Sequence, residues 1–442
     1  MKPFLQQLQH GGVVGAGGAG FPTYIKLDCQ VDTVIANGAE CEPLLNKDQV
    51  LMQLHHESLI KGMLLAMAEV GATTGIIGVK KKNTQTIKML KPHLPSNITL
   101  LEMEDVYPAG DEVELVYQAT GKRIPAGGLP KDIGIVVNNI ESIINTYHAS
   151  QNVPVTHSMV TVHGEVETPY TADLPIGMSY REAIALAGDI LCDDFVVIEG
   201  GPMMGSVTTD LSKPITKISS GLLVLRADSR LAKIKQRSDK QVVKMAKSAC
   251  DQCGQCSVMC PRGLLGYPIN PQKVMRTLQT SMDISHAMAS QGCCGCNLCT
   301  VWSCPEGLDP SRVCGLTKQA LGANKRLQPP AALQAAMGDI HPLRAYRGVA
   351  TKRLMRRLEV LKYYDKVADF RADIPAVERV IIPLSQHIGR PAEPIVSVGD
   401  MVTKGQMLAK PASDSLSVAV HASIDGQVVS VGGDITIEYK NK

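Results

Sequence analysis

Residues 250–261 read CDQCGQCSVMCP, and residues 293–305 read CCGCNLCTVWSCP. Each run has three cysteines at two-residue intervals and, a few residues later, a cysteine followed by proline. This pattern is typical of [4Fe-4S] binding, because three closely spaced thiolates can hold three corners of one cluster. The stretch therefore predicts an iron–sulfur domain around which the rest of the chain is organised.

The two runs resemble those of bacterial two-cluster ferredoxins, in which the distal cysteine of each run binds the other cluster. The resemblance implies a first cysteine set of Cys250, Cys253, Cys256 and Cys304, and a second of Cys293, Cys296, Cys299 and Cys260. The second run departs from the pattern, because four residues separate Cys299 from Cys304 and because Cys294 can replace Cys293. Structural zinc and disulfides are the alternatives, although zinc usually takes two separated cysteine pairs.

The composition excludes several classes of protein. A chain of 442 residues is too long for one ordinary core and indicates more than one domain. The net charge of +3 and the 4% aromatic content argue against a nucleic-acid binder. Thirteen cysteines fit a reducing cytoplasm better than an oxidising compartment. We expect a cytoplasmic protein without a transmembrane segment, since no apolar run approaches the ~20 residues of a membrane span.

Alternating strands and helices are predicted for the N-terminal third of the chain. Residues 48–70 have the apolar spacing of a single helix that stops at Gly71. Buried strands are expected at residues 34–36, 75–79 and 98–101. The alternation predicts βαβ units and a parallel sheet.

Four loops of this region carry candidate site residues. The glycine-rich loop GGVVGAGGAGFPT spans residues 11–23, and glycines let a backbone approach a phosphate closely. The expected first strand runs into two carboxylates in NGAECEP, residues 37–43. The other two loops are VYPAGDE at residues 106–112 and GIVVNN at residues 134–139. Strand ends with such residues are frequent ligand sites in α/β proteins.

Together these four loops resemble the flavin- and NADH-binding subunit of respiratory complex I and the C subunit of the Rnf electron-transport complex, where they build one pocket. The resemblance implies a Rossmann-like domain. It implies that FMN is lined by Gly15, Gly17, Gly18, Lys26, Asn37, Glu40, Tyr107, Gly110, Asp111, Asn138 and Asn139. It implies that NADH is contacted by Phe21, Lys26, Glu42 and Glu112. The alternative is that these residues are turn glycines and surface carboxylates.

The resemblance also divides the chain into domains, and the expected fold class is multidomain α/β and α+β. The expected parts are an FMN/NADH-binding domain (residues 1–150), an SLBB β-grasp module (151–235), a ferredoxin-type helical two-cluster domain (236–325), a basic helical linker (326–375) and a barrel-sandwich hybrid domain (376–442). Ser179 and Glu182 predict a capping box at one helix start. The basic residues between 341 and 366 are expected to face solvent. Cys29, Cys192 and Cys314 are interpreted as core thiols and Cys41 as structural.

The order of these segments favours one family. In Rnf C subunits the barrel-sandwich segment precedes the flavin domain, whereas here it comes last. The whole chain resembles the PduS-type cobalamin reductases of propanediol-utilisation microcompartments, which have this order. The resemblance implies an oxidoreductase that passes electrons from NADH through FMN and two [4Fe-4S] clusters to cob(III)/cob(II)alamin for coenzyme B12 regeneration, with no catalytic side chain. It also implies a corrinoid adenosyltransferase of the PduO type and microcompartment shell or cargo proteins as partners, and a location inside a bacterial microcompartment.

Two other functions stay open at this point. One is an Rnf C-like NADH oxidoreductase subunit that feeds another electron carrier, and the other is a non-catalytic electron-relay component of a microcompartment. The DxHxxG motif of base-off cobalamin binders is missing, since the nearest stretch, Asp339-Ile340-His341, has Arg344 where glycine is required. The sequence therefore assigns no corrin site.

Overall fold

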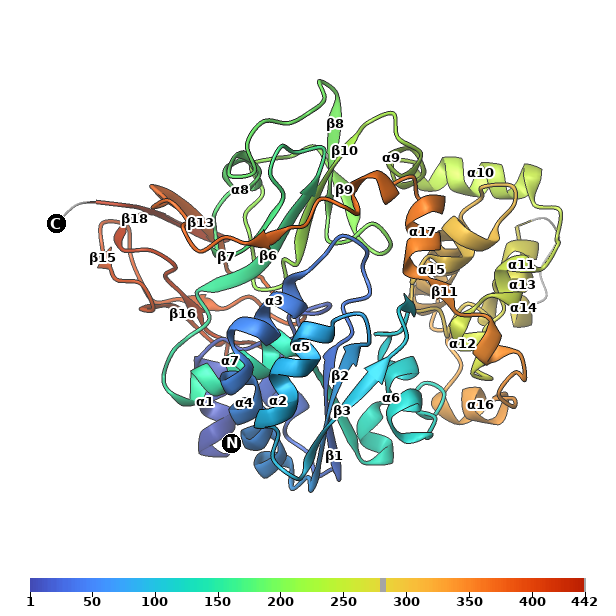
Figure 1. Ribbon diagram of the computed structural model, residues 1–442, viewed down its shortest axis with the longest axis horizontal. Coiled ribbons are helices and arrows are strands. Elements are labelled where there is room, and N and C mark those ends of the chain that lie inside the picture. Colours follow the sequence, from blue (N-terminus) through green and yellow to red (C-terminus); the bar gives the residue numbers. More distant parts are fainter. Residues whose placement is uncertain (279–283, 441–442) are drawn as a thin grey trace.

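The computed structural model describes residues 1–278 and 284–440. Figure 1 shows a parallel sheet with its helices at the bottom, a second sheet above it, a helical part on the right and the C-terminal strands on the left. The expected mixed α/β architecture with a parallel sheet is confirmed. Within the described residues, no helix combines the length and the apolar character that crossing a membrane requires.

The first sheet has four parallel strands in the order β3-β2-β1-β5. Its strands are β1 (Thr33–Gly38), β2 (Thr74–Lys80), β3 (Ile98–Met103) and β5 (Ile135–Asn139). Its helices are α1 (Pro3–His10), α2 (Thr23–Lys26), α3 (Lys47–Leu54), α4 (His56–Val70), α5 (Thr84–Leu90), α6 (Glu112–Thr120) and α7 (Ile140–Ser150). The three predicted strands are confirmed, since β1, β2 and β3 cover them.

The single helix predicted for residues 48–70 is wrong. The chain forms α3 and α4, which meet at His55, a residue with non-helical backbone angles. Lys47 and Asp48 are buried at the start of α3, whereas α4 packs against α7. The apolar spacing continues across this break, so the sequence pattern does not reveal it. The predicted stop is confirmed, because Gly71 adopts φ 72° after α4.

The second sheet has six strands in the order β12-β7-β6-β10-β8-β9. Its strands are β6 (His157–Gly164), β7 (Tyr170–Pro175), β8 (Phe195–Glu199), β9 (Ser206–Thr208), β10 (Gly221–Arg226) and β12 (Asp369–Phe370). Helix α8 (Tyr180–Ala185) begins with the predicted capping box, in which Ser179 Oγ accepts from the Glu182 N–H at 3.2 Å. The strand β12 comes from far along the chain and pairs with β7 in parallel.

Short helices make up the part that carries the cysteines. They are α9 (Arg230–Lys235), α10 (Asp239–Ala249), α11 (Gln255–Val258), α12 (Pro261–Leu264), α13 (Pro271–Arg276), α14 (Ile284–Met288), a π-helical turn η3 (Cys299–Ser303), α15 (Pro310–Ala323) and α16 (Pro330–Ala335). Of the three cysteines interpreted as core thiols, Cys314 is buried, whereas Cys29 and Cys192 are only half-buried.

The expectation that the basic residues between 341 and 366 face solvent is wrong for several of them. Arg344 pairs with Glu114 of α6. Arg347 and Arg357 donate to the carbonyls of Val258 and Val301, at 2.9 and 3.3 Å. This region also forms β11 (Val349–Ala350), which pairs with β4 (Val106–Tyr107), and α17 (Thr351–Arg357). It therefore ties the cysteine-bearing helices to the first sheet, which a charge pattern alone does not indicate.

The C-terminal strands pack against the N-terminal end of the chain. They are β13 (Arg379–Pro383), β14 (Glu393–Pro394), β15 (Met401–Val402), β16 (Met407–Lys410), β17 (Val420–His421), β18 (Gly426–Val431) and β19 (Asp434–Glu438), in sheets of order β13-β19-β18-β15 and β14-β16-β17. The Ala419 N–H donates to the Gln9 carbonyl at 3.0 Å. The buried Lys217 ammonium donates to the carbonyls of Gly12 and Ala419 at 2.8 and 2.7 Å.

We expect Gly62→Ala to destabilise the protein by about 1–3 kcal/mol, because overpacking a close helix crossing forces the backbones apart. A Cβ added at Gly62 of α4 lies 2.2 Å from the Ile143 carbonyl oxygen of α7. Gly315→Ala is the matched control, since Gly315 also lies within a helix but its added Cβ meets no atom within 4 Å. Helix propensity should make that change stabilising by up to about 1 kcal/mol. Thermal unfolding midpoints compare the two, and an unchanged midpoint for Gly62→Ala contradicts this packing.

Candidate functional site

The carboxyl ends of β1 and β5 bring two of the predicted residues side by side. The register of the parallel sheet pairs Asn37 with Asn139. The Asn37 side chain donates to the Gly110 carbonyl at 2.8 Å and accepts from the Ala39 N–H at 3.2 Å. Asn139 caps α7 by accepting from the Glu141 N–H at 2.9 Å. Both side chains thus fix loops at the sheet edge where α/β proteins bind ligands.

The glycine-rich loop lies against this edge and is partly open. The Ala16 N–H donates to a serine hydroxyl of α7 at 3.0 Å, and the Ala16 carbonyl accepts from Lys47 Nζ at 3.2 Å. A Cβ added at Gly17 lies 3.0 Å from the Asn139 side chain, whereas one added at Gly18 meets no atom within 4 Å. Gly17 and Gly18 are both exposed. The loop is therefore anchored at one residue and accessible at the next two, which suits a backbone that binds phosphate.

Buried charged side chains hold the glycine-rich loop in place. Lys47 Nζ lies 2.6 Å from Glu141 Oε2, and the two side chains are only 2% and 6% exposed. Glu40 accepts from the Asp48 N–H at 2.9 Å, and Asn139 donates to both Asp48 carboxylate oxygens. Burial raises the pKa of Glu40, and burial followed by repulsion from Glu40 raises the pKa of Asp48. This pair therefore holds a proton more readily than exposed carboxylates do.

Unpartnered polar atoms at this edge fit the group that the sequence implies. Asn138 Nδ2 and Thr23 Oγ1 are buried and have no hydrogen-bond partner among the described residues. Buried polar groups in native proteins are nearly always hydrogen-bonded. Asn138 lies at the end of β5, and Thr23 ends the glycine-rich loop. A bound FMN has ring and phosphate oxygens that accept from such donors, so these residues fit FMN.

Three of the residues expected to contact NADH lie in or near the glycine-rich loop, namely Phe21, Lys26 and Glu112. The Phe21 ring is exposed, and the Gly15 N–H donates to the Phe21 carbonyl at 3.0 Å, which closes the loop. Lys26 Nζ lies 3.4 Å from Glu112 Oε1, and both side chains are partly exposed. An accessible aromatic ring and an accessible ion pair are available to a ligand here.

Glu42, the fourth residue expected to contact NADH, is held by the loop GGPMMG of residues 200–205. Its carboxylate oxygens accept from the N–H groups of Met203 and Met204, both at 2.7 Å. Burial raises the pKa of Glu42. The Met203 carbonyl in turn accepts from Asn297 of the second cysteine run at 2.7 Å. The carboxylate therefore links three parts of the chain and has fewer positions left for ribose hydroxyls than the resemblance implies.

The Tyr107 hydroxyl reaches the second cysteine set. Tyr107 is 2% exposed, and its O–H donates to the Cys296 carbonyl at 2.7 Å. Nearby, the Gly110 N–H donates to Cys41 Sγ at 2.6 Å. Burial raises the pKa of Cys41 to about 11, so that it acts as a neutral, packed thiol. The predicted flavin loop and a cysteine run are thus in direct contact.

Asp111 makes a second link between these two regions. It is the N-cap of α6 and accepts from the Val113 and Glu114 N–H groups. Its oxygens also pair with Nε and Nη2 of Arg262 at 3.1 and 2.8 Å. Arg262 follows Cys260 and Pro261 directly. A bidentate pair of this kind fixes orientation as well as distance, so it holds α12 in place against α6.

The structure brings the first cysteine set together around one cavity, which is lined by Cys250, Cys253, Cys256 and Cys304. Burial, followed by the neighbouring Cys250 and Cys304, raises the pKa of Cys256 to about 11. Burial also raises the pKa of Cys304. The four thiols lie close together around this cavity, and an iron cluster would bind them as thiolates. This donor set fits a [4Fe-4S] cluster.

The second cysteine set contacts both the flavin loop, through Cys296, and the core that holds Cys304 of the first set, through Cys293. Burial, followed by Cys294 and Cys293, raises the pKa of Cys260 to about 12. Cys294 is hydrogen-bonded to Cys296, and Cys293 to Cys314. Cys293 and Cys294 therefore both neighbour Cys260. No group of three or more His, Cys, Asp or Glu side chains in residues 1–278 and 284–440 is placed to hold a single metal ion, whereas a four-iron cube spreads its thiolates more widely.

The backbones of the two runs repeat each other. Gln252 and Gly254 have φ of 61° and 80°, and Gly295 and Asn297 have φ of 71° and 60°. Left-handed residues thus flank the middle cysteine of each run. This correspondence places Cys293 at the position of the first cysteine of the first run.

The extra residue before Cys304 forms the π-helical turn η3 (Cys299–Ser303). Single π-helical turns often absorb one added residue in a helix at functional sites. The departure from the expected spacing is therefore local, and Cys304 still reaches the first cavity.

Sequence reasoning missed several residues of this region. Lys47 and Asp48 begin a helix, where charged residues are usually exposed, and no sequence signal marks them as buried. Arg262 and Asn297 lie inside the cysteine runs, where only the thiols carry a recognisable spacing. A basic residue directly after Cys-Pro is the one signal that could have indicated Arg262.

Family comparisons match three parts of the chain. Residues 8–148 match the Nuo51 FMN-binding domain, residues 249–309 a 4Fe-4S dicluster domain, and residues 370–440 the RnfC barrel sandwich hybrid domain. The order of the matches along the chain places the RnfC segment last, as the sequence predicts.

Curated relatives match nearly the whole chain. Cobalamin reductase PduS of Citrobacter freundii is 40% identical over 430 residues, 96% of this chain and 94% of the relative. The protein of the same name from Salmonella typhimurium is 39% identical over the same shares. The C subunit of the Na(+)-translocating ferredoxin:NAD(+) oxidoreductase complex of Acetobacterium woodii is 35% identical over 59% of this chain and 57% of that protein. An NAD+-reducing [NiFe]-hydrogenase structure, in its H2-reduced state, is 19% identical with a TM-score of 0.49 over 74% of this chain and 62% of that one.

Serine substitutions distinguish the cysteines that bind iron from those that do not. We expect Cys256→Ser, Cys304→Ser and Cys293→Ser each to remove about half of the iron and sulfide, because each set is expected to hold one of two clusters. Cys294→Ser should retain both, since Cys294 occupies no position repeated in the first run. Cys192→Ser is the control, because Cys192 lies outside both sets. Iron and sulfide analysis of anaerobically prepared protein measures the outcome, and loss with Cys294→Ser but not Cys293→Ser reverses the assignment.

Proposed function

This chain belongs to the family of PduS cobalamin reductases, and from that membership we propose that it passes electrons from NADH through FMN and two [4Fe-4S] clusters to cobalamin. It is an NADH-dependent flavin and iron–sulfur oxidoreductase. The observation that carries the proposal is the hydrogen bond from Tyr107 to the Cys296 carbonyl, because it joins the flavin loop directly to a cysteine set.

FMN, when bound, accepts a pair of electrons as hydride and releases them one at a time, which suits one-electron acceptors such as iron clusters and cobalt. The chain's own contribution is to bind and orient. Gly17 and Gly18 are exposed, so that their backbone can approach a phosphate. Asn138 and Thr23 offer unpartnered polar atoms to the ring or ribityl chain. Glu40 and Asp48, whose pKa values are raised by burial, can hold a proton near the ring.

The ligand sets belong to the same proposal. Cys250, Cys253, Cys256 and Cys304 hold one cluster, and Cys293, Cys296, Cys299 and Cys260 hold the other. The cavity that the first set lines supports this assignment, as does the repeated backbone of the two runs. The remaining FMN and NADH contacts follow the resemblance, with Phe21, Lys26 and Glu112 on the NADH side.

We further propose that residues 151–235 form an SLBB module and residues 376–442 a barrel-sandwich hybrid domain. The mixed six-stranded sheet and the match of residues 370–440 support these assignments. Partners are a corrinoid adenosyltransferase and microcompartment shell or cargo proteins, inside the cytoplasm. Family membership alone supports this context. The PduS relatives match 96% of the chain and the Rnf relative 59%, which favours the reductase over a component of a membrane complex.

Anaerobic purification followed by iron, sulfide and flavin analysis tests the proposal. We expect both cofactor types, bleaching of the flavin absorbance on addition of NADH, and reduction of added hydroxocobalamin only when NADH is present. A heat-treated sample controls for direct reduction by NADH. Protein that contains zinc in place of iron and binds no flavin contradicts the whole proposal. Flavin that bleaches without any reduction of the corrin contradicts the acceptor and leaves the architecture standing.

A further inference from the structure

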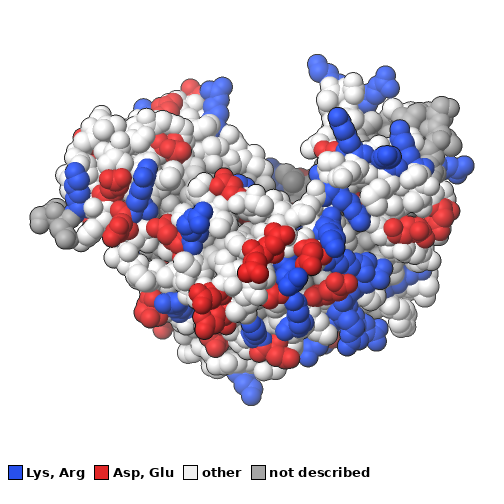
Figure 2. Space-filling model, turned by 90° about the horizontal axis from the view of Figure 1, so that it is seen from above, with Lys and Arg blue, Asp and Glu red and all other residues white. Residues whose placement is uncertain are grey.

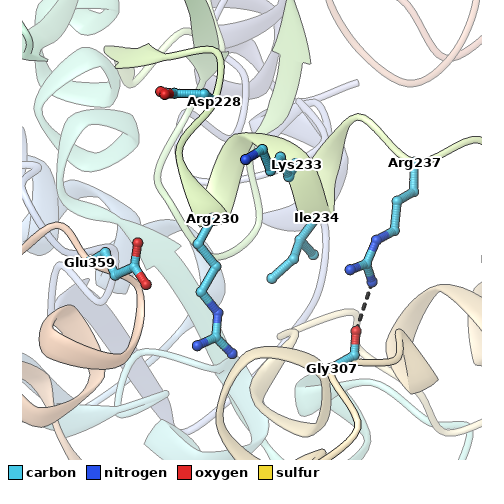
Figure 3. A pocket seen from close by; sticks show the side chains of 7 residues that line it. All are labelled: Asp228, Arg230, Lys233, Ile234, Arg237, Gly307 and Glu359. Atoms are coloured by element: carbon cyan, nitrogen blue, oxygen red, sulfur yellow. Dashed lines mark hydrogen bonds between the residues drawn. The ribbon is translucent and has the colours of Figure 1, made fainter.

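A solvent-accessible cavity of about 450 Å³ lies beside the first cysteine set, between α9 and the loop at residues 306–308. Figure 3 shows its lining residues, which include Asp228, Arg230, Lys233, Arg237, Gly307 and Glu359. We call it the basic cavity. In Figure 2, Lys and Arg side chains gather over the right-hand half of the molecule, where Figure 1 places α9, α10 and α17.

We infer that the basic cavity binds the phosphate diester of the corrinoid acceptor and so places the acceptor beside the first cysteine set. The inference rests on the proposed function, because it takes cobalamin as the acceptor. It adds a binding site and names the part of the acceptor that is recognised.

The charges of the lining favour an anion. Asp228 is already paired with Arg226, whose Nε and Nη2 lie 3.0 and 3.1 Å from its two oxygens. Arg230 and Lys233 have no ion pair or side-chain hydrogen bond with another described residue, and in Figure 3 both extend from α9 at the cavity. A guanidinium fork and an ammonium group without partners are the side chains that bind phosphate.

One wall of the cavity is fixed in place. Arg237 Nη1 donates to the Gly307 carbonyl at 2.7 Å, drawn as the dashed line in Figure 3. Glu359 stands on the opposite side with its carboxylate free of any described partner. Carboxylates accept hydrogen bonds from amides, and a corrin ring carries amide groups around its edge. The lining thus offers cations for one phosphate and an acceptor for amides.

The cavity shares a wall with the first cysteine set. Gly307 lines the basic cavity, while its neighbours Glu306 and Leu308 line the cavity formed by the four cysteines of that set. A single residue separates Cys304 from this loop. A molecule in the basic cavity is therefore separated from the first set by the loop at residues 306–308.

The positions of the two cysteine sets indicate the direction in which electrons flow. The second set contacts the flavin loop through Cys296 and Tyr107, so it receives electrons. Cys304 of the first set packs with Val242, Val274 and Val313, in a core that Cys293 of the second set also contacts. The first set borders the basic cavity through the loop at residues 306–308, and so lies at the exit. A cavity of this size is within the range of small-molecule sites, and it suits the nucleotide loop of cobalamin rather than the entire molecule.

Binding measurements with two corrinoids test the inference. Cobinamide lacks the phosphate diester and nucleotide that cobalamin has. Equilibrium dialysis of the anaerobic holoprotein should show tighter binding of hydroxocobalamin than of cobinamide. The double variant Arg230→Gln with Lys233→Gln should weaken hydroxocobalamin binding at least about tenfold, because two charged hydrogen-bond donors are lost. Its affinity for cobinamide should stay unchanged.

The matched control is the double variant Lys240→Gln with Lys244→Gln, which also removes two positive charges, from exposed positions on the neighbouring α10. Flavin content, iron content and flavin bleaching by NADH should be those of wild type in all variants, which excludes misfolding. Equal hydroxocobalamin binding by the double variant and wild type overturns the inference while leaving the proposed function intact. Loss of NADH binding with cobalamin binding retained also overturns it and assigns the cavity to NADH. If the wild-type protein binds no corrinoid at all, both the inference and the proposed function are contradicted.

Discussion

The bidentate ion pair between Asp111 and Arg262 is the constraint on which the arrangement of this protein depends. Asp111 caps α6 beside the first sheet, and Arg262 lies next to a cysteine of the second set. The two side chains are only 12% and 20% exposed. Removing either partner would leave a largely buried charge, which is costly. The pair thus holds the cysteine-bearing helices against the sheet edge, and the Tyr107 hydrogen bond then fixes the contact at the cysteines themselves.

Sequence patterns predicted the parts of this protein whose signal is local. The cysteine spacing predicted two sets, and the first set does line one cavity. The short apolar runs predicted β1, β2 and β3. What escaped prediction depends on contacts between distant segments. Glu42 holds the GGPMMG loop, and Arg344 pairs with Glu114. A carboxylate at a strand end and an arginine in a basic run look the same whether they face solvent or another domain.

The C-terminal strands pack against the start of the chain although they come last in the sequence. The segment that matches the RnfC barrel sandwich hybrid domain is the last along this chain. In space it lies beside α1, where Ala419 bonds to Gln9 and Lys217 bridges Gly12 and Ala419. A segment that packs against the first helix can be joined to either end of the flavin domain without losing those contacts. The position of this segment along the chain therefore does not by itself decide where it packs.

The asymmetry between the two cysteine sets argues for a one-way path through the protein. Cys260 of the second set packs in the core that contains Ile35 and Val137 of the first sheet. Cys304 of the first set packs among the helices, away from that sheet. The protein thus buries one set against the flavin loop and leaves the other beside a solvent-accessible cavity. The second set contacts the flavin loop through Tyr107, whereas the first set borders the basic cavity through the loop at residues 306–308. Electrons that pass through iron clusters move singly, as reduction of cobalt requires.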